Sequence, residues 1–421
     1  MIDRIVTHFK TIGLFRTFKL MVVRLLTSAM AFPIVLTIIF VSPWIKIRLI
    51  RLFSYRIGHY SLNTELLLCG LDKNLFNESK KIKNFFYTFP HEPICNQQLH
   101  QMWKRIITIL PGPLLWREVD RQLMIVYGKK YRDDPMKVTF ETASGNQDKW
   151  NFLDSKSNCH LTFTEKEKYK GAHLLKALGI SEGSPFICLL GRDGNYLKQY
   201  LPDTDWSYHD YRDFSIQTYK KMALFLAEAG YYVIRMGKDV KDPFIVNHPQ
   251  VIDYANHPSR SDFLDIYLAA HCFFFISPRS GIDGVAQIFR RPLLLTNFPL
   301  CDFWSLFDLD LLIPKKVLNK KTNQWLTFKE MCWVMERRSM MKILEDKEWH
   351  FVENTEDELV EVADEMVKRL THSWHESEEH AQLQEQFWQL IPIEKSLWFY
   401  DRMKMRIGHV FLKRYESLLT H

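Results

Sequence analysis

The fold is decided by a stretch that begins Phe186-Ile187-Cys188-Leu189-Leu190 and continues Gly191-Arg192-Asp193-Gly194-Asn195-Tyr196. The first five residues are all apolar, and the next six are glycine, polar or charged, apart from the phenol ring of Tyr196. A short apolar run that stops in this way predicts a strand buried on both faces of a parallel sheet, followed by a loop.

Four similar apolar runs follow, at Tyr231–Ile234, Val251–Tyr254, Cys272–Ser277 and Pro292–Thr296. Helical patterns lie between or before the runs, over Glu165–Leu178, Asp213–Ala229 and Ser261 to about Ala270. Buried strands that alternate with helices predict a parallel sheet with right-handed crossovers. We therefore expect an α/β fold of the doubly wound, nucleotide-binding type.

The loops after these strands share a chemistry. In a parallel sheet they all leave the same carboxyl edge, where open α/β sheets bind ligands. Several arginines and glycines at one edge predict an anionic ligand, most simply a phosphate or diphosphate. The candidate binding residues are Arg192, Gly194, Asn195, Tyr196, Arg235, Met236, Gly237, Asp253, Tyr254, Arg260, Ser261, Ser277, Ser280, Gly281, Thr296 and Asn297.

Two of these positions carry specific hypotheses. Ser280-Gly281 precedes a helical pattern, and the free N–H groups of a helix start bind phosphate. Ordinary helix capping explains the same pair. Arg192 offers a two-pronged donor for phosphate oxygens, or it forms a surface salt bridge with Asp193 or Asp210.

The first half of the chain has a weaker pattern. The stretch from Ile47 to Tyr55 reads as a strand, Arg56-Ile57-Gly58-His59 as a turn, and a helix follows from Asn63. Strand, glycine turn and helix open a doubly wound domain. Residues Arg56, Gly58, His59 and Asn63 then face a ligand, with His59 as a candidate base; the alternative is a capping loop whose histidine only packs.

The N-terminus carries most of the net charge of +7. Residues 1–60 hold nine Lys or Arg and one Asp, whereas the remainder holds 47 basic and 48 acidic residues. A neutral body excludes a nucleic-acid surface spread over a folded face. Between Arg24 and Lys46 lie 21 uncharged residues, which as a helix are about 31 Å long, one hydrocarbon thickness. We expect membrane association through residues about 20–47, either spanning or re-entrant near Pro33 and Pro43, with a buried core helix as the alternative.

Several other patterns exclude function classes. The seven scattered cysteines have no metal-ligand or redox spacing, which fits a reducing compartment. The sequence lacks a glycine-rich dinucleotide fingerprint, a Walker loop and a nucleophile elbow. Asp308-Leu309-Asp310 imitates a metal-binding motif, but we expect its charges to face solvent. We expect the same of His372, His375 and His380, so we predict no metal site.

The quoted blocks resemble a family of bacterial glycosyltransferases of the GT-B type, with two Rossmann-like domains. The resemblance rests on Arg56–His59 with Asn63-Thr64-Glu65-Leu66, on the loop at 191–196, and on blocks at 230–237, 251–254, 260–262, 275–281 and 295–298. The likeness is continuous over residues 186–300, with an outlying block at 50–70. Gly191 departs from the pattern, because similar loops carry a histidine there.

The resemblance implies a division of labour and an order of domains. It implies a metal-independent transfer from a nucleotide-sugar to a glycan or lipid-linked acceptor in cell-surface polysaccharide synthesis. Arg192, Arg235, Ser280 and Gly281 would hold the diphosphate, and His59 or Asp193 would act as the base. The expected order is a membrane segment at 1–47, an acceptor domain at 48–160, a donor domain at 161–354 and helices at 355–421 that return to the acceptor domain.

Two alternative functions remain open. The chain is either the expected enzyme at the cytoplasmic face of the membrane, or a membrane-tethered regulator that binds a nucleotide or glycan without turnover. The third reading is a sugar-nucleotide epimerase. No cofactor is expected for the transferase, because its nucleotide-sugar is a substrate.

Overall fold

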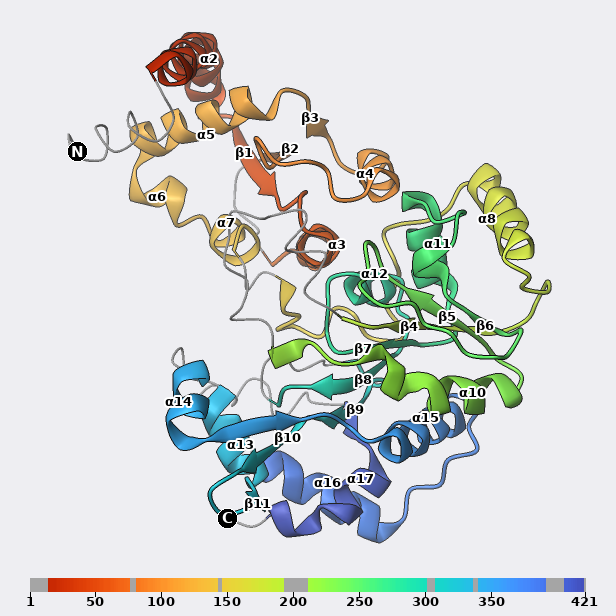
Figure 1. Cartoon of the computed structure of the whole chain (residues 1–421). Helices are drawn as coiled ribbons and strands as arrows, with labels where there is room; N and C mark the ends of the chain where they lie inside the picture. Colours follow the sequence, from red (N-terminus) through yellow and green to blue (C-terminus); the bar gives the residue numbers. More distant parts are fainter. Residues whose placement is uncertain are drawn as a thin grey trace. The chain divides into compact units, whose positions relative to one another are not determined.

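The computed structural model describes residues 14–75, 81–142, 146–192, 211–300, 307–335, 340–390 and 405–419, with side chains from Phe18 onward. The chain divides into two compact units, Met1–Asn146 and Gln147–His421 (Figure 1). The division falls within the polar stretch 128–158.

The first unit is built on a parallel sheet in the order β1-β2-β3. Strand β1 (Ile45–Leu52) pairs along its whole length with β2 (Lys81–Thr88), which pairs with β3 (Ile109–Leu110). Each strand is followed by a helix: α3 (Ile57–Asp72), α4 (Gln97–Lys104) and α5 (Pro113–Tyr127). Strand β1 begins and ends earlier than the sequence predicts. Helix α3 begins six residues before Asn63, so the expected turn is already helical from Ile57.

The long helix α2 (Leu14–Val41) packs on this sheet. Its residues Ala31, Val35 and Ile38 form one buried cluster with Leu49 of β1, Tyr87 of β2, and Val119 and Leu123 of α5. Positions 31, 35 and 38 lie on one face of a helix, because they follow the 3.6-residue period. One face of the C-terminal part of the predicted membrane segment is therefore packed in a folded core.

A buried polar network fixes the chain after α5, where α6 (Lys129–Arg132) and α7 (Pro135–Phe140) follow. Asp120 accepts hydrogen bonds from Tyr131 Oη at 2.6 Å, Lys137 Nζ at 2.7 Å and Tyr87 Oη at 3.1 Å. Arg48 Nε donates to Asp134 Oδ2 at 3.1 Å. A buried carboxylate with several charged or hydroxyl donors ties α5 and α7 to the sheet, because removing any donor leaves a buried charge undercompensated.

The second unit holds a seven-stranded sheet in the order β13-β9-β8-β7-β4-β5-β6, and every neighbouring pair is parallel. The strands are β4 (Phe186–Leu190), β5 (Tyr232–Met236), β6 (Val251–Ile252), β7 (Phe275–Ser277), β8 (Leu293–Phe298), β9 (Leu311–Pro314) and β13 (Arg406–Ile407). All five predicted strands are present, and the parallel arrangement is confirmed. Strands β9 and β13 extend the sheet beyond the prediction.

Helices precede and connect the strands of this sheet (Figure 1). They are α8 (Glu165–Ala177), η3 (Ile216–Tyr219), α10 (Lys220–Glu228), η4 (Tyr254–Asn256), α11 (Asp262–His271) and α12 (Asp283–Ile288). A small antiparallel sheet, β11-β10-β12, comprises β10 (Lys316–Asn319), β11 (Gln324–Trp325) and β12 (Trp349–Val352).

The C-terminal part completes the second unit. Its helices are α13 (Phe328–Met335), α14 (Met340–Lys347), α15 (Glu356–Leu370), α16 (Glu378–Gln389), α17 (His409–Arg414) and η7 (Glu416–Leu419). A capping box of Thr355 and Glu358 opens α15. Helix α15 packs on α10, β8 and β9, so its apolar stripe is covered within its own unit.

Two local predictions are wrong. Asp310 is buried and accepts a hydrogen bond from the Leu293 amide at 2.6 Å, instead of facing solvent. His380 is buried beside the ring of His409, at 4.1 Å between centroids. Cys332 is disulfide-bonded, whereas Cys69, Cys95, Cys159, Cys188 and Cys272 are free thiols.

Candidate functional site

The order of the strands identifies the crevice of the second unit. From β4 the chain proceeds to β5 and β6 on one side, and then returns to β7, β8 and β9 on the other. The topological switch therefore lies between β4 and β7, where open α/β sheets bind their ligands. Leu189 is paired with Ile276, so the two strands end together at Leu190 and Ser277.

The loop after β4 carries Gly191 and Arg192. A Cβ atom on Gly191 would lie 2.7 Å from Cδ1 of Ile216, so glycine permits the close approach of η3. Arg192 Nε lies 3.5 Å from Oδ1 of Asp213, and its side chain is 12% exposed. This ion pair differs from the two partners that the sequence offered. Asp193, Gly194, Asn195 and Tyr196 lie outside the described residues.

Lys315 directly follows β9, on the other side of the topological switch from β5 and β6. Its Nζ donates to the backbone oxygens of Asp213 at 2.7 Å and Tyr211 at 3.0 Å. The pKa of Lys315 is lowered to about 8, chiefly by burial and to a smaller extent by Arg192, while Glu353 and Asp213 oppose this shift. A buried lysine with a perturbed pKa at the ligand edge of a sheet is a functional-site candidate.

We call Arg192, Asp213, Lys315 and Glu353 the edge cluster. Glu353, after β12, accepts a hydrogen bond from the Ser215 amide at 3.4 Å, which ties it to the segment that holds Asp213. Two cations and two carboxylates balance one another. An anionic ligand that reached Arg192 and Lys315 would raise the pKa of Lys315 and favour its charged form.

The neighbouring Lys316 shows why Lys315 is the candidate. Lys316 is also buried, but its Nζ contacts both carboxylate oxygens of Glu358, at 2.6 and 2.9 Å. Its charge is therefore compensated inside the fold. Lys315 was not predicted from the sequence, although this lysine follows an apolar strand as the other candidates do.

The loop after β7 does not form the open phosphate site that Ser280-Gly281 predicts. Helix α12 begins at Asp283, and the Asp283 carboxylate accepts hydrogen bonds from the Ser280 amide and the Ser277 hydroxyl, both at 2.7 Å. Arg279, with φ +68°, donates to Gln287 at 2.7 Å. The Asp283 carboxylate therefore already accepts the hydrogen bond of the amide that was expected to bind a phosphate. Burial raises the pKa of Asp283.

The candidates at the carboxyl end of β5 and β6 are held by contacts within the fold. Arg235 is buried and donates to Asp253 Oδ1 at 3.0 Å and to the Asp242 backbone oxygen at 3.1 Å. The other oxygen of Asp253 accepts the Phe244 amide at 3.0 Å. Met236 is buried as well. Gly237 has φ +152°, a conformation that favours glycine. This group stiffens the edge of the sheet.

A second internal network joins η4 to α11. Tyr254 Oη donates to Asp265 Oδ1 at 2.8 Å, and Arg260 Nη1 donates to Asp265 Oδ2 at 2.7 Å. Burial raises the pKa of Asp265 to about 6, which Arg260 opposes. Ser261 caps α11 by accepting the Leu264 amide at 3.3 Å. The four polar groups are thus engaged with one another.

Thr296 and Asn297 are inside β8 and fully buried, so they do not form a loop. Tyr219 Oη contacts Thr296 Oγ1 at 2.7 Å. Asn297 and Asn354 exchange amide hydrogen bonds of 2.6 and 2.7 Å. These contacts attach η3 and the segment before α15 to the sheet, which is a structural role.

In the first unit, His59 lies in the first turn of α3, at the carboxyl end of β1. Its Nδ1 lies 3.3 Å from Asn63 Oδ1, and Asn63 Nδ2 donates to the Phe140 backbone oxygen at 2.8 Å. The amide oxygen of Asn63 must therefore accept, so Nδ1 of His59 carries the proton and Nε2 is the acceptor. Burial, with help from Arg56, lowers the pKa of His59 to about 4. A base this weak accepts hydrogen bonds at neutral pH better than it removes protons.

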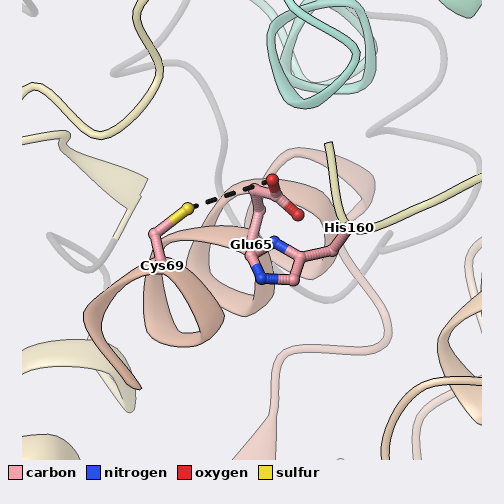
Figure 2. A group of neighbouring side chains, drawn as sticks. All are labelled: Glu65, Cys69 and His160. Carbon is pink, nitrogen blue, oxygen red and sulfur yellow. Dashed lines mark hydrogen bonds between the residues drawn. The ribbon is translucent and has the colours of Figure 1, made fainter. Parts of the chain in front are cut away.

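An aromatic ring packs beside His59 at this edge. Its ring centroid lies 5.3 Å from that of Phe53, and the guanidinium of Arg51 lies 4.9 Å from the ring centroid of Phe89. Further along α3, Glu65 and Cys69 occupy successive turns, and Cys69 Sγ donates to Glu65 Oε1 at 4.0 Å (Figure 2). His160, also drawn there, belongs to the second unit.

No family model and no curated protein matches the chain. Two solved structures are similar to it: a glycosyl transferase family 9 protein from Veillonella parvula and the ADP-heptose lps heptosyltransferase II of E. coli. The first is 10% identical, covers 59% of this chain and 79% of its own, and has a TM-score of 0.36. The second is 14% identical, covers 59% and 84%, and has a TM-score of 0.34. The fold of the second unit is assigned from its strand order and not from these two likenesses.

Proposed function

We propose that this chain is a glycosyltransferase that transfers a sugar from a nucleotide-sugar to a glycan or lipid-linked acceptor. The sugar donor would bind at the carboxyl edge of the seven-stranded sheet, between the loops after β4 and β9. The resemblance of the sequence blocks at 186–300 to GT-B transferases supports the proposal, as does the doubly wound order of the strands.

The observation that carries the proposal is the convergence of Arg192 and Lys315 on Asp213. Arg192 can grip two phosphate oxygens at once, and Lys315 adds a compact charge. Both cations are largely buried, so water screens their attraction for a diphosphate poorly. Sites of this kind suit a ligand that carries concentrated negative charge.

The reaction makes one bond and breaks one. An acceptor hydroxyl oxygen bonds to the anomeric carbon, the bond from that carbon to the phosphate oxygen breaks, and the nucleoside diphosphate leaves with the electron pair. Arg192 and Lys315 would stabilise the charge that develops on it, as a metal ion does in other transferases. The hydroxyl proton needs a base; the low pKa of His59 makes it an acceptor, which leaves Asp193 as the proposed base.

Thermal unfolding of the full chain with a panel of nucleotide-sugars and free nucleotides tests the donor site. A ligand at 100 times its dissociation constant stabilises the fold by about 2.7 kcal/mol. The shift should become much smaller in Arg192→Gln and Lys315→Met and persist unchanged in Lys168→Met, whose lysine pairs with Glu165 at 2.7 Å on α8. Absence of any shift would reject the donor site.

A second measurement separates an enzyme from a regulator. Transferases hydrolyse their donor slowly when no acceptor is present, so free nucleoside diphosphate should accumulate with the ligand that shifts the melting temperature. Binding without release of diphosphate would favour the regulator, and reversible conversion of the sugar would favour the epimerase. The cytoplasmic location remains part of the proposal, because nucleotide-sugars are cytosolic.

A further inference from the structure

Helix α2 has two apolar faces. One face, with Ala31, Val35 and Ile38, is buried against the sheet and α5. The opposite face is exposed, and its large side chains recur at helical spacing: Phe18, Val22, Leu25, Phe32, Leu36 and Phe40. Leu36 and Ile38 are two positions apart, about 200° around the helix. A helix that packs one face in a core normally presents a polar face to water.

The exposed face is too large to be ordinary surface. Within the described residues, α2 is the one helix long and apolar enough to cross a membrane, over Phe18–Val41. Phe40 is 73% exposed, and Trp44, just beyond the helix, lies 5.9 Å from its ring. Contiguous apolar surface of this extent indicates a lipid or protein partner.

Helix α5 adds a second element to this surface. Gln122 Nε2 donates to the backbone oxygen of Ser28 at 3.1 Å and to its hydroxyl at 3.0 Å, so α5 lies beside the middle of α2. Ile125 follows Gln122 on the same side of α5, because positions three apart are neighbours on a helix. Its side chain is 68% exposed.

The same contact argues against a spanning helix. Glu118, one turn before Gln122, is paired with Arg121 at 2.6 Å, and this arginine lowers the pKa of Glu118 to about 2. If α2 crossed a bilayer as it is packed, this charged pair would lie near the hydrocarbon centre. Charged groups are expelled from that depth.

Charge at both ends of the surface fits an anionic membrane. Lys19 and Arg24 of α2 are exposed, as are Lys129 and Lys130, which follow α5. Helix α2 has no acidic residue. Helices that lie in the interface combine an apolar face with basic residues that contact anionic headgroups.

We propose that α2 and α5 together form a surface that lies in one leaflet of an anionic membrane, with α2 parallel to the bilayer. The outward residues of α2 and Ile125 of α5 enter the acyl region, while the core contacts of Ala31, Val35 and Ile38 stay intact. This inference does not depend on the transferase activity. It replaces both the spanning and the re-entrant arrangement.

Vesicle flotation of the full chain tests the proposal. Protein purified in detergent is dialysed with vesicles of phosphatidylglycerol and phosphatidylethanolamine and then floated. Ile125→Asp should lower the vesicle partition coefficient about tenfold or more, and Leu36→Asp should lower it as well. Ile245→Asp, a matched control at a 71% exposed isoleucine of the second unit, should bind as the unchanged chain does.

Three results would overturn the proposal. One is Ile125→Asp binding as the unchanged chain does while Leu36→Asp does not bind, which would leave α2 alone as the anchor. Another is an equal loss in Ile245→Asp. A third is a dimer in buffer without vesicles that Ile125→Asp dissociates, which would assign the surface to a second copy of the chain.

The orientation of α2 has its own readout. Cysteines introduced at Lys19 and Pro43, both exposed, mark the two ends of the helix. An impermeant maleimide should label both from the same side of sealed proteoliposomes, above the background of the unsubstituted chain. Labelling from opposite sides would show a spanning helix and reject the in-plane arrangement, even if the protein folds and floats normally.

Discussion

The ammonium group of Lys315 lies 2.7 Å from the backbone oxygen of Asp213, and the carboxylate of the same aspartate lies 3.5 Å from Arg192 Nε. One residue thus couples the loops that follow β4 and β9, which are separated in the sheet by β7 and β8. Because both cations are positioned by the same short segment, a ligand that displaces Asp213 would release both of them.

The lowered pKa of Lys315 predicts a pH-dependent affinity. The charged lysine should bind a diphosphate, so affinity should fall as pH rises through about 8, by about tenfold between pH 7 and pH 9. Isothermal titration of the best nucleotide-sugar over this range measures it. In Lys315→Met the affinity should be lower and this slope absent; an unchanged slope would assign the titration to another group.

The lowered pKa of Lys315 also predicts how the stability of the protein without ligand depends on pH. The pKa of about 8 in the folded protein is below the ordinary lysine pKa of 10.5, so between these values the unfolded chain binds more protons than the folded one. The contribution of Lys315 to stability should therefore increase with pH from about 8 to about 10.5. Urea unfolding of the unchanged chain and of Lys315→Met should differ in slope in this window.

Loss of the Arg192 guanidinium should weaken the donor selectively. Hydrogen bonds to charged groups contribute about 1.5–3 kcal/mol, so Arg192→Gln should lower the affinity for a nucleotide-sugar about 10- to 100-fold. Arg192→Lys should recover part of it, since a point charge replaces a fork. Equal affinities in all three proteins would remove Arg192 from the site.

The buried pair of Lys316 and Glu358 should dominate local stability. Tyr415 Oη also donates to Glu358, at 2.6 Å. Lys316→Met leaves a buried carboxylate without its ion pair, and should cost about 3–5 kcal/mol of unfolding free energy. The double variant Lys316→Met/Glu358→Leu should recover much of that loss; two additive losses in chemical denaturation would contradict the pairing.

The contact of Gly191 with Ile216 should be detectable as a clash. Gly191→Ala places a methyl group 2.7 Å from Cδ1 of Ile216 and should cost about 1–3 kcal/mol. Ile216→Val removes that Cδ1 atom, so the double variant should be less destabilised than the two single costs together. Strict additivity in urea unfolding would show that the loop moves away freely.

Five strands of the second unit could be predicted from local patterns in the sequence. The run at 186–190 is β4 without a shift of boundary, because a short apolar run that stops at glycine and polar residues suits a strand covered on both faces. Thr355 and Glu358 likewise fixed the start of α15, because a capping box is satisfied by residues three apart. Such patterns are local, so they can be read along the chain.

Only the tertiary structure decided which candidates are available to a ligand. Arg235, Thr296 and Asn297 follow the same strand-end pattern as Arg192, yet residues such as Asp253 and Asn354, distant in sequence, engage them inside the fold. Lys315 became a candidate because segments around residues 192, 213 and 353 surround it. The two faces of α2 differ for the same reason. The composition of α2 makes the helix apolar all round, and the packing of α5 and the sheet determines which face is buried. Burial depends on what packs against a residue rather than on the residue itself.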